Sequence, residues 1–400
     1  MLKVLHVIPS VSSARGGPTL VALNLVKALR DRNVDAEIVT TNDDDGIRVL
    51  DVPCDRRIEY EGVPIRFFPL FATPTKGVSL GNDRGFLFSW PLTRWMWQNL
   101  NDYDILDTHY LFSYCSTCAG AIARWKNIPY TVRTMGQLSP WALAQSRRKK
   151  QIYAALIERQ NLNKAAIVHC TSRGEAEDVN NFGVVAPKAI LPLGVRSGTK
   201  IEDAGLKLRQ LYNIPAESAI VLFLSRIHYK KRPELLLDAL HSLKSKHHFH
   251  LIFAGTGDKE YLQQIESLIE SLDLTKQVTF AGFVTGESKA LVLQGSDFFV
   301  LPSFAENFAI AVAEAMAAGL PVIITPEVQI APEVDAANAG LVVEGEVKTV
   351  VDAIATLLTS PQLRQELGNN GKQLVKTRYS WEAIAGDLIS VYQKAIDSYR

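Results

Sequence analysis

Two glutamates interrupt a stretch that otherwise predicts an alanine-rich helix followed by a buried strand, FAENFAIAVAEAMAAGLPVII at 304–324. Acidic side chains are almost never fully buried unless they are paired. Glu306 and Glu314 stand eight residues apart, which is about 12 Å along a helix at about 1.5 Å per residue. That separation roughly matches the reach across a nucleotide diphosphate from a sugar to the ribose. Each carboxylate could therefore accept hydrogen bonds from hydroxyls at one end of such a ligand.

The helix that carries Glu314 is expected to begin at about Asn307–Phe308, after a predicted strand at 297–303. The first N–H groups of a helix have no partner within it, and the helix dipole places positive charge there. These groups suit a diphosphate. They belong to Asn307, Phe308, Ala309 and Ile310.

Two cations follow another predicted strand, at 219–225, in the stretch SRIHYKKRPELLLDAL. Arg226 and Lys231 stand between this strand and a helix that starts near Pro233. Two fixed cations at the carboxyl end of a strand would neutralise a phosphate, the arginine bidentately and the lysine as a point charge. A solvated basic loop is the alternative interpretation of the same residues.

A glycine pair, Gly16 and Gly17, separates the first predicted strand (3–8) from a helix at 18–33. Glycines let a backbone approach a ligand, and the following helix N-terminus favours an anion. An ordinary turn would also use them. The G-x-G-x-x-G pattern of dinucleotide-binding folds is absent, and the next strand (35–41) has no acidic residue at its tip, which argues against an NAD site.

Two small groups of residues raise the question of a metal. Asp43, Asp44 and Asp45 could hold a divalent ion, but charge runs usually face water, so a solvated turn is expected. Cys115 and Cys118 form a C-x-x-C without a second pair, so small buried thiols on a helix are expected. No metal site is predicted.

Apolar strands alternate with helices along the whole chain, which predicts parallel sheets covered on both faces. Two such blocks imply two doubly wound α/β domains with a boundary near 190–200, where proline and glycine interrupt the pattern. The tail at 379–399 is expected to be a helix that Ser380 caps. The other predicted strands are 104–109, 130–134, 165–171, 250–255, 278–282 and 321–325, and a long helix is predicted at about 140–163.

Composition and charge exclude several classes of protein. The 400 residues are 47% hydrophobic and 21% charged with a formal net charge of +1, so nothing points to a nucleic-acid partner. No apolar run approaches the length of about 20 residues that a membrane span needs. The N-terminus does not resemble a secretory signal, so reduced thiols and a cytoplasmic location are expected.

In their order, these motifs closely resemble the retaining nucleotide-sugar glycosyltransferases of family 4. Glu306 and Glu314 match the E-x7-E signature of that family. SRIHYKKR resembles its G-R-x-x-x-x-K-G element, with Ser225 in place of the first glycine and Arg232 in place of the last. Three further matches extend the resemblance over nearly the whole chain: the Gly16–Gly17 loop, LPLGV at 191–195 and YSW at 379–381.

The resemblance implies the GT-B architecture, an α/β fold of two Rossmann-like doubly wound parallel-sheet domains that face each other across a cleft. The expected parts are an acceptor-binding domain at 1–195, a nucleotide-sugar-binding domain at 196–378, and a helix at 379–400 that crosses back to the first domain.

The implied activity is retaining transfer of a sugar from a nucleoside diphosphate sugar to a saccharide or lipid-linked saccharide, in polysaccharide or glycolipid assembly. UDP-glucose is the first candidate donor, from family frequency alone. No cofactor and no metal are expected, because such enzymes usually need no divalent ion. Two alternative functions match the sequence less well. A nucleotide-dependent oxidoreductase lacks the glycine fingerprint, and the retained charged residues argue against a non-catalytic scaffold subunit of the same fold.

The family's functional residues carry over to matching positions. The resemblance implies that Arg226 and Lys231 hold the diphosphate and stabilise the departing nucleotide, and that Glu306 lies against the donor sugar. Glu314 would hold the ribose hydroxyls, and Phe283, after the strand at 278–282, lies where the family holds the base. The remaining catalytic match is His109, at a strand end, which corresponds to a family histidine that faces the donor sugar.

Two positions depart from the family pattern. The family usually has Gly-Phe-Gly after its first glutamate, where this chain has Asn307-Phe308-Ala309. An asparagine commonly precedes the glycine of LPLGV, where this chain has Leu193. Neither change removes a charge from the expected chemistry.

Two segments bear on the acceptor. Residues 84–98 are dense in aromatic side chains, and residues 139–160 carry four consecutive cations. A basic helix with aromatic residues can lie on an anionic membrane surface, which would suit a lipid-linked acceptor at the inner leaflet. Helix packing beside a solvated basic turn is the competing interpretation.

Overall fold

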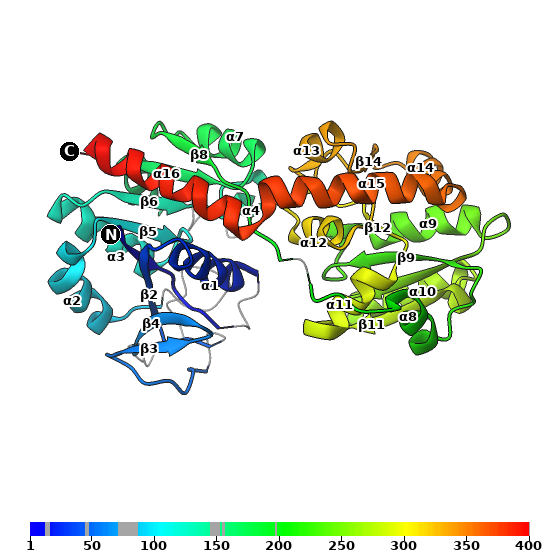
Figure 1. Ribbon diagram of the computed structural model, residues 1–400, viewed down its shortest axis with the longest axis horizontal. Coiled ribbons are helices and arrows are strands. Elements are labelled where there is room, and N and C mark those ends of the chain that lie inside the picture. The colour runs from blue at the N-terminus through cyan, green and yellow to red at the C-terminus, as the bar shows by residue number, and fades with distance from the viewer. Residues whose placement is uncertain are drawn as a thin grey trace. The chain divides into compact units, whose positions relative to one another are not determined.

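The computed structural model describes residues 1–12, 17–44, 48–70, 87–144, 153, 157–196 and 198–399, with the Pro18 side chain left out. The chain divides into two compact units (Figure 1). The first comprises Met1–Gly194 and Trp381–Arg400, and the second comprises Val195–Ser380. Each unit is an α/β domain, as the sequence predicts, and most of its strands are parallel.

The first unit has an eight-stranded sheet in the order β3-β4-β2-β1-β5-β6-β7-β8. Its strands are β1 (Lys3–Val7), β2 (Asp35–Thr41), β3 (Arg57–Tyr60), β4 (Val63–Phe68), β5 (Ile105–His109), β6 (Tyr130–Arg133), β7 (Ile167–Cys170) and β8 (Lys188–Ile190). Its helices are α1 (Gly17–Arg30), α2 (Trp90–Asn99), α3 (Tyr114–Lys126), α4 (Pro140–Ala144), α6 (Arg159–Asn163), α7 (Arg173–Asn181) and α16 (Trp381–Tyr399). The C-terminal helix α16 packs on α1 within this unit.

One edge of this sheet differs from the expected parallel pattern. Strands β3 and β4 pair antiparallel, with Ile58 opposite Ile65. Glu61 and Gly62 connect them with positive φ angles of 53° and 71°. Two consecutive left-handed residues make the turn that matches strand twist in a two-residue hairpin. The expectation of purely parallel sheets is therefore wrong at this edge.

The second unit has a six-stranded parallel sheet in the order β11-β10-β9-β12-β13-β14. Its strands are β9 (Ala219–Leu224), β10 (Phe249–Ala254), β11 (Val278–Gly282), β12 (Phe298–Leu301), β13 (Val322–Ile324) and β14 (Gly340–Val342). Its helices are α8 (Ala204–Tyr212), α9 (Pro233–Leu243), α10 (Lys259–Ser271), α11 (Gly286–Gly295), α12 (Ile310–Ala318), α13 (Ala331–Ala336), α14 (Val347–Thr359) and α15 (Pro361–Leu374).

The strand order of the second sheet reverses between β9 and β12. The chain runs outward from β9 through β10 to β11, and then outward in the opposite direction from β12 through β13 to β14. Right-handed crossovers then put helices on both faces (Figure 1), which is why β10 is buried along its whole length. Open α/β sheets bind ligands beyond the carboxyl ends of the strands at such a reversal, which here lies between β9 and β12.

The structure describes one predicted helix only in part and places the start of another later than expected. The helix expected at about 140–163 is described only at its ends, as α4 and α6, and much of its middle lies outside the described residues. Helix α12 begins at Ile310 rather than at Asn307–Phe308, because Ala309 has a left-handed backbone (φ 54°, ψ 67°) that a helix cannot continue through. No helix in the described part of the chain is long and apolar enough to cross a membrane.

Candidate active site

The loops after β9 and β12 are hydrogen-bonded to each other at the point where the strand order reverses. The carbonyl oxygen of Lys230 accepts from the backbone N–H of Phe304 (2.8 Å) and from the hydroxyl of Ser303 (3.0 Å). These bonds hold the basic loop after β9 against the acidic loop after β12. The second sheet thus presents cations and carboxylates together at its carboxyl edge.

Lys231 and Glu306 form an ion pair across these two loops. The Glu306 carboxylate also accepts from the Ser303 hydroxyl at 2.9 Å. The two charged side chains are only 13% and 12% exposed. The Glu306 backbone is fixed as well, because it bonds on both sides to the segment around Val328. Two residues that the sequence analysis selected are therefore in direct contact and held in place.

The loop after β9 carries more positive than negative charge. Arg226 is exposed, and within the described part of the chain it forms no ion pair. Burial lowers the pKa of the half-buried Lys230 ammonium; Glu306 opposes this effect, and Lys231 and Arg226 add to it. Like charges crowded in this way favour binding of an anion.

Gly255 and Gly257, after β10, let a third loop approach the loop after β9. Gly255 has φ of +146°, and a Cβ at either glycine would collide with a backbone carbonyl oxygen, that of Ser225 or Ile227. The N–H of Ile227 in turn donates to the carbonyl of Thr256 at 2.9 Å. These glycines therefore serve close backbone packing beneath the charged loop.

Helix α12 presents its N-terminus beside this loop. Phe308 is buried and packs edge-on against Tyr379, with ring centroids 5.4 Å apart. One turn into α12, Glu314 pairs with Lys289 of α11 at 2.6 Å. The predicted set of four helical N–H groups is wrong in part, because Asn307, Phe308 and Ala309 precede the helix and only Ile310 belongs to it.

Phe283 follows β11 at the carboxyl edge of the same sheet. Its side chain is 77% exposed. A large apolar ring that is exposed next to a polar site is available for stacking on a planar ligand. Its predicted role at a base remains a prediction.

The glycine loop and the acidic turn of the first unit are described only in part. Gly17 begins α1, while Gly16 and Asp45 lie outside the described residues. The expectation of a solvated acidic turn is wrong for Asp43, which is buried and whose carbonyl accepts from the Ser10 hydroxyl at 2.8 Å. Asp44 accepts from the Ser12 hydroxyl at 2.5 Å. The C-x-x-C cysteines lie on α3, as expected, with Cys115 buried and Cys118 only partly buried.

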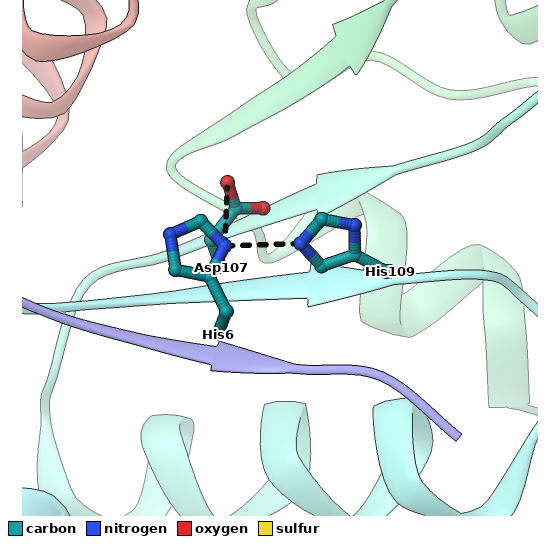
Figure 2. A group of neighbouring side chains, drawn as sticks. All are labelled: His6, Asp107 and His109. Atoms are coloured by element: carbon teal, nitrogen blue, oxygen red, sulfur yellow. Dashed lines mark hydrogen bonds and ion pairs between the residues drawn. The ribbon is translucent and has the colours of Figure 1, made fainter. Parts of the chain in front are cut away.

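His109 ends β5 in a buried polar cluster (Figure 2). Its Nε2 lies 3.0 Å from Nδ1 of His6 on β1, and that Nδ1 lies 3.9 Å from a carboxylate oxygen of Asp107. All three side chains are fully buried. Arg133 donates to Asp107 at 3.0 Å, and the Tyr392 hydroxyl of α16 donates to the same oxygen.

Burial favours the neutral form of the histidines in this cluster. Burial lowers the pKa of His6 to about 4, against the opposing effect of Asp107, and lowers the pKa of His109 well below its usual value. Burial alone would raise the Asp107 pKa, but the Arg133 guanidinium holds it well below the usual range. His6, Asp107 and His109 have ligand atoms close enough to hold a metal ion. A divalent ion would add two buried charges beside Arg133 with one carboxylate to balance them, so the set fits a metal poorly.

Two family models together match most of the chain. One, described as "Glycosyl transferase 4-like domain", matches residues 16–194, and another, described as "Glycosyl transferases group 1", matches residues 206–374. The chain belongs to the family 4 glycosyltransferases. This assignment excludes the oxidoreductase alternative.

Known proteins agree with the assignment. The glycosyltransferase is 26% identical to a D-inositol 3-phosphate glycosyltransferase of Xylanimonas cellulosilytica, over 95% of this chain and 92% of that protein. It is 29% identical to an uncharacterised glycosyltransferase of Methanocaldococcus jannaschii over 48% of this chain, and spans about half (49%) of that relative. The structure of HepE from Anabaena with UDP and glucose covers 98% of this chain and 100% of its own, with a TM-score of 0.75 and 20% identity. HepE structures also exist with UDP and with UDP-glucose. This likeness shows the GT-B fold.

The glycosyltransferase has left-handed residues at two positions where the family motifs have glycine. Arg232 has φ of 54°; its guanidinium lies 4.3 Å from the centroid of the Phe304 ring and donates to the Gly345 carbonyl. Ala309 has φ of 54° as well. Asn307 is not among the left-handed residues. Arg232 and Ala309 therefore adopt the left-handed backbone that glycine adopts most readily.

Of the buried polar cluster around His109, the sequence of the glycosyltransferase led to the prediction of His109 alone. The signal for the other members is weak. His6, Asp107, Arg133 and His169 each interrupt a strand that is otherwise largely apolar. A polar residue inside such a run is an anomaly that calls for a buried partner. The partners become evident only from the strand register, which pairs His6 with Asp107 and Arg133 with His169.

Proposed function

We propose that the enzyme transfers a sugar, with retention at the anomeric carbon, from a nucleoside diphosphate sugar to a saccharide or lipid-linked saccharide. The observation that carries the proposal is the charge arrangement in the second unit, where Arg226 and the Lys231–Glu306 pair meet at the switch point between β9 and β12. A diphosphate matches the excess of cations, and a sugar hydroxyl matches a fixed carboxylate.

UDP-glucose is the proposed donor. HepE, which shares the fold, has been solved with UDP-glucose, and this supports the choice without deciding it. Glu314 would accept hydrogen bonds from the ribose, with Lys289 holding its carboxylate in place. The exposed Phe283 ring would stack on the base. The phosphates would meet the start of α12 at Ile310.

The proposed chemistry needs no metal. Arg226 and Lys231 would neutralise the charge that develops on the leaving diphosphate, which is the effect expected of fixed cations in a protected site. Lys231 would be shared between the diphosphate and Glu306. A front-face path, in which the leaving phosphate accepts the proton of the acceptor hydroxyl, is preferred to double displacement because no nucleophile beneath the sugar has been identified.

The first unit would bind the acceptor. Gly16 and Gly17 are proposed to approach the donor phosphates, and His109 the donor sugar. His109 is fully buried, so this role requires that the donor reach the end of β5. The relative from Xylanimonas acts, by its name, on an inositol phosphate, and a polyol acceptor is compatible with the proposal. The enzyme would work in the cytoplasm, with peripheral contact at the inner face of the membrane for a lipid-linked acceptor.

Calorimetry with UDP, GDP, ADP and NAD tests the nucleotide, and hydrolysis of nucleotide sugars tests the donor. The expected result is UDP binding with slow release of glucose from UDP-glucose. Arg226→Ala is expected to lower turnover about 100-fold, whereas Lys207→Ala, an exposed cation on α8, should leave turnover unchanged. Unchanged turnover in the Arg226 variant would remove its leaving-group role. No nucleotide binding at all would favour a non-catalytic scaffold.

A further inference from the structure

Helices α2 and α3 of the first unit carry three large exposed aromatic rings. Trp90 is 59% exposed, Trp97 47% and Trp125 78%. The opposite side of α2 already supplies the core, through the fully buried Leu92 and Met96. The exposed tryptophans therefore contribute little to folding of this unit.

These side chains form one surface. Trp90, Arg94 and Trp97 follow one another on α2 at spacings of four and three residues, which places them on one face of a helix. Trp97 meets Trp125 of α3, with ring centroids 6.0 Å apart. The Lys126 ammonium lies 5.5 Å from the centroid of the Trp97 ring. We call Trp90, Arg94, Trp97, Trp125 and Lys126 the tryptophan surface.

The charge of the tryptophan surface is positive. Neither Trp90–Asn99 nor Tyr114–Lys126 contains an aspartate or a glutamate. Arg94 and Lys126 contribute cations at the surface. The third cation of these helices, Arg124, is directed inward and donates to Asn161 (2.7 Å) and to the Tyr130 hydroxyl (3.0 Å).

Tryptophan and cations together, on two helices that carry no acid and with Asp102 only beyond the end of α2, match the surface of an anionic bilayer. The indole ring is apolar with one polar N–H, so it is favoured at the boundary between lipid head groups and acyl chains. Arginine and lysine next to it are attracted to anionic head groups. A saccharide would use the rings but has no need of the cations. If a second copy of the chain bound through the same surface, the cations of the two copies would repel each other.

We propose that the tryptophan surface is where the enzyme contacts a bilayer that contains anionic phospholipids. This inference rests on the membrane contact in the proposed function and gives it a location on α2 and α3. Residues 139–160, the other segment that suggested membrane binding, are not needed for it.

Vesicle flotation tests the proposal with the full chain. Vesicles of phosphatidylglycerol and phosphatidylcholine should carry the protein at low salt, and vesicles of phosphatidylcholine alone should carry much less. Trp97→Ala with Trp125→Ala should lower binding about ten-fold. Arg94→Gln and Lys126→Gln should each lower it about five-fold and reduce its dependence on salt.

The controls separate this proposal from the catalytic one. Leu206→Ala with Leu211→Ala removes two exposed apolar side chains from α8 of the second unit and should leave flotation unchanged. UDP binding, measured by calorimetry, should be the same in the tryptophan variant and the parent. The membrane proposal would be overturned if the tryptophan variant and the parent floated equally. It would also be overturned if the parent bound neutral and anionic vesicles equally. Concentration-dependent dimerisation that the tryptophan variant abolishes would replace it with self-association.

Discussion

At the scale of single residues, charge was easier to predict than backbone conformation. Glu306 and Lys231 attract attention because charged side chains stand out next to apolar strands, and the structure pairs them. Ala309 carries no such signal. Its left-handed φ of 54° depends on how the chain enters α12, and an alanine in a sequence gives no indication of a positive φ.

Ala309→Gly is expected to raise the free energy of unfolding by about 1 kcal/mol. A residue with a Cβ is strained in the left-handed region, and glycine is not. The gain is partly offset because glycine has more freedom in the unfolded chain. Urea unfolding of the second unit measures the change.

Ala311→Gly provides the matched control two residues further on. Ala311 is inside α12, where glycine weakens the helix by about 1 kcal/mol. The two substitutions should therefore change stability in opposite directions. Loss of stability in both variants would contradict the assignment of strain to Ala309.

At the scale of elements, the strands that are apolar throughout were predicted well. Strands such as β9 and β10 appear in the sequence as continuous apolar runs because helices cover both faces of the sheet. The β3–β4 hairpin was missed, since half-exposed strands alternate and have a shorter apolar signal. Strand order and register, which create the site and the buried cluster, depend on long-range packing that no local pattern encodes.

The buried cluster gives the first sheet a predictable response to acid. Burial lowers the pKa of His169 to about 3; Arg133 adds to this effect and Asp107 opposes it. Below about pH 6.5 His169 is protonated in the unfolded chain but stays neutral in the folded protein. The free energy of unfolding therefore decreases as the pH is lowered. His169→Phe removes this loss. Relative to the parent, its free energy of unfolding should rise by about 1.4 kcal/mol for each pH unit below about 6.5.

Other groups titrate in the same range, so the comparison must be between variant and parent. His6 and His109 in the cluster remain in both proteins, as does His250 of the second unit, whose pKa burial lowers to about 4. Burial raises the pKa of Glu158 to about 7, which stabilises the first unit as pH falls. Glu158→Gln should therefore lose stability relative to the parent as the pH falls below about 7. A pH-independent difference for His169→Phe would show that its imidazole titrates normally.

At the scale of the whole molecule, each unit has its own core. The cluster that contains Leu5, Leu106 and Val168 belongs entirely to the first unit, and the strands β9 to β14 bury a separate set of side chains in the second. The division into two α/β domains was predictable, because two blocks of alternating strands and helices flank a segment interrupted by proline and glycine. Gly194, next to that division, has no room for a Cβ beside the Trp381 ring.

Separate cores predict two unfolding transitions, and UDP should shift mainly the transition of the second unit. Most of the proposed nucleotide-binding residues belong to the second unit, and only Gly16 and Gly17 belong to the first. UDP should therefore raise the transition of the second unit much more than that of the first. At a UDP concentration of about 100 times Kd, the expected gain is about 2.7 kcal/mol. Calorimetric scans with and without UDP measure it, with the fluorescence of Trp97 and Trp125 reporting on the first unit.

The Arg226→Ala variant makes this test specific to the proposed site. Arg226 is exposed, so its removal should leave both transitions of the unliganded protein almost unchanged. The variant binds the diphosphate more weakly, and the UDP-dependent shift of the second transition should shrink with the loss of affinity. An equal shift of both transitions by UDP would mean that the first unit contributes as much to nucleotide binding as the second. A shift of the first alone would place the nucleotide site away from β9 and β12 and contradict the roles proposed for Arg226, Lys231 and Glu306.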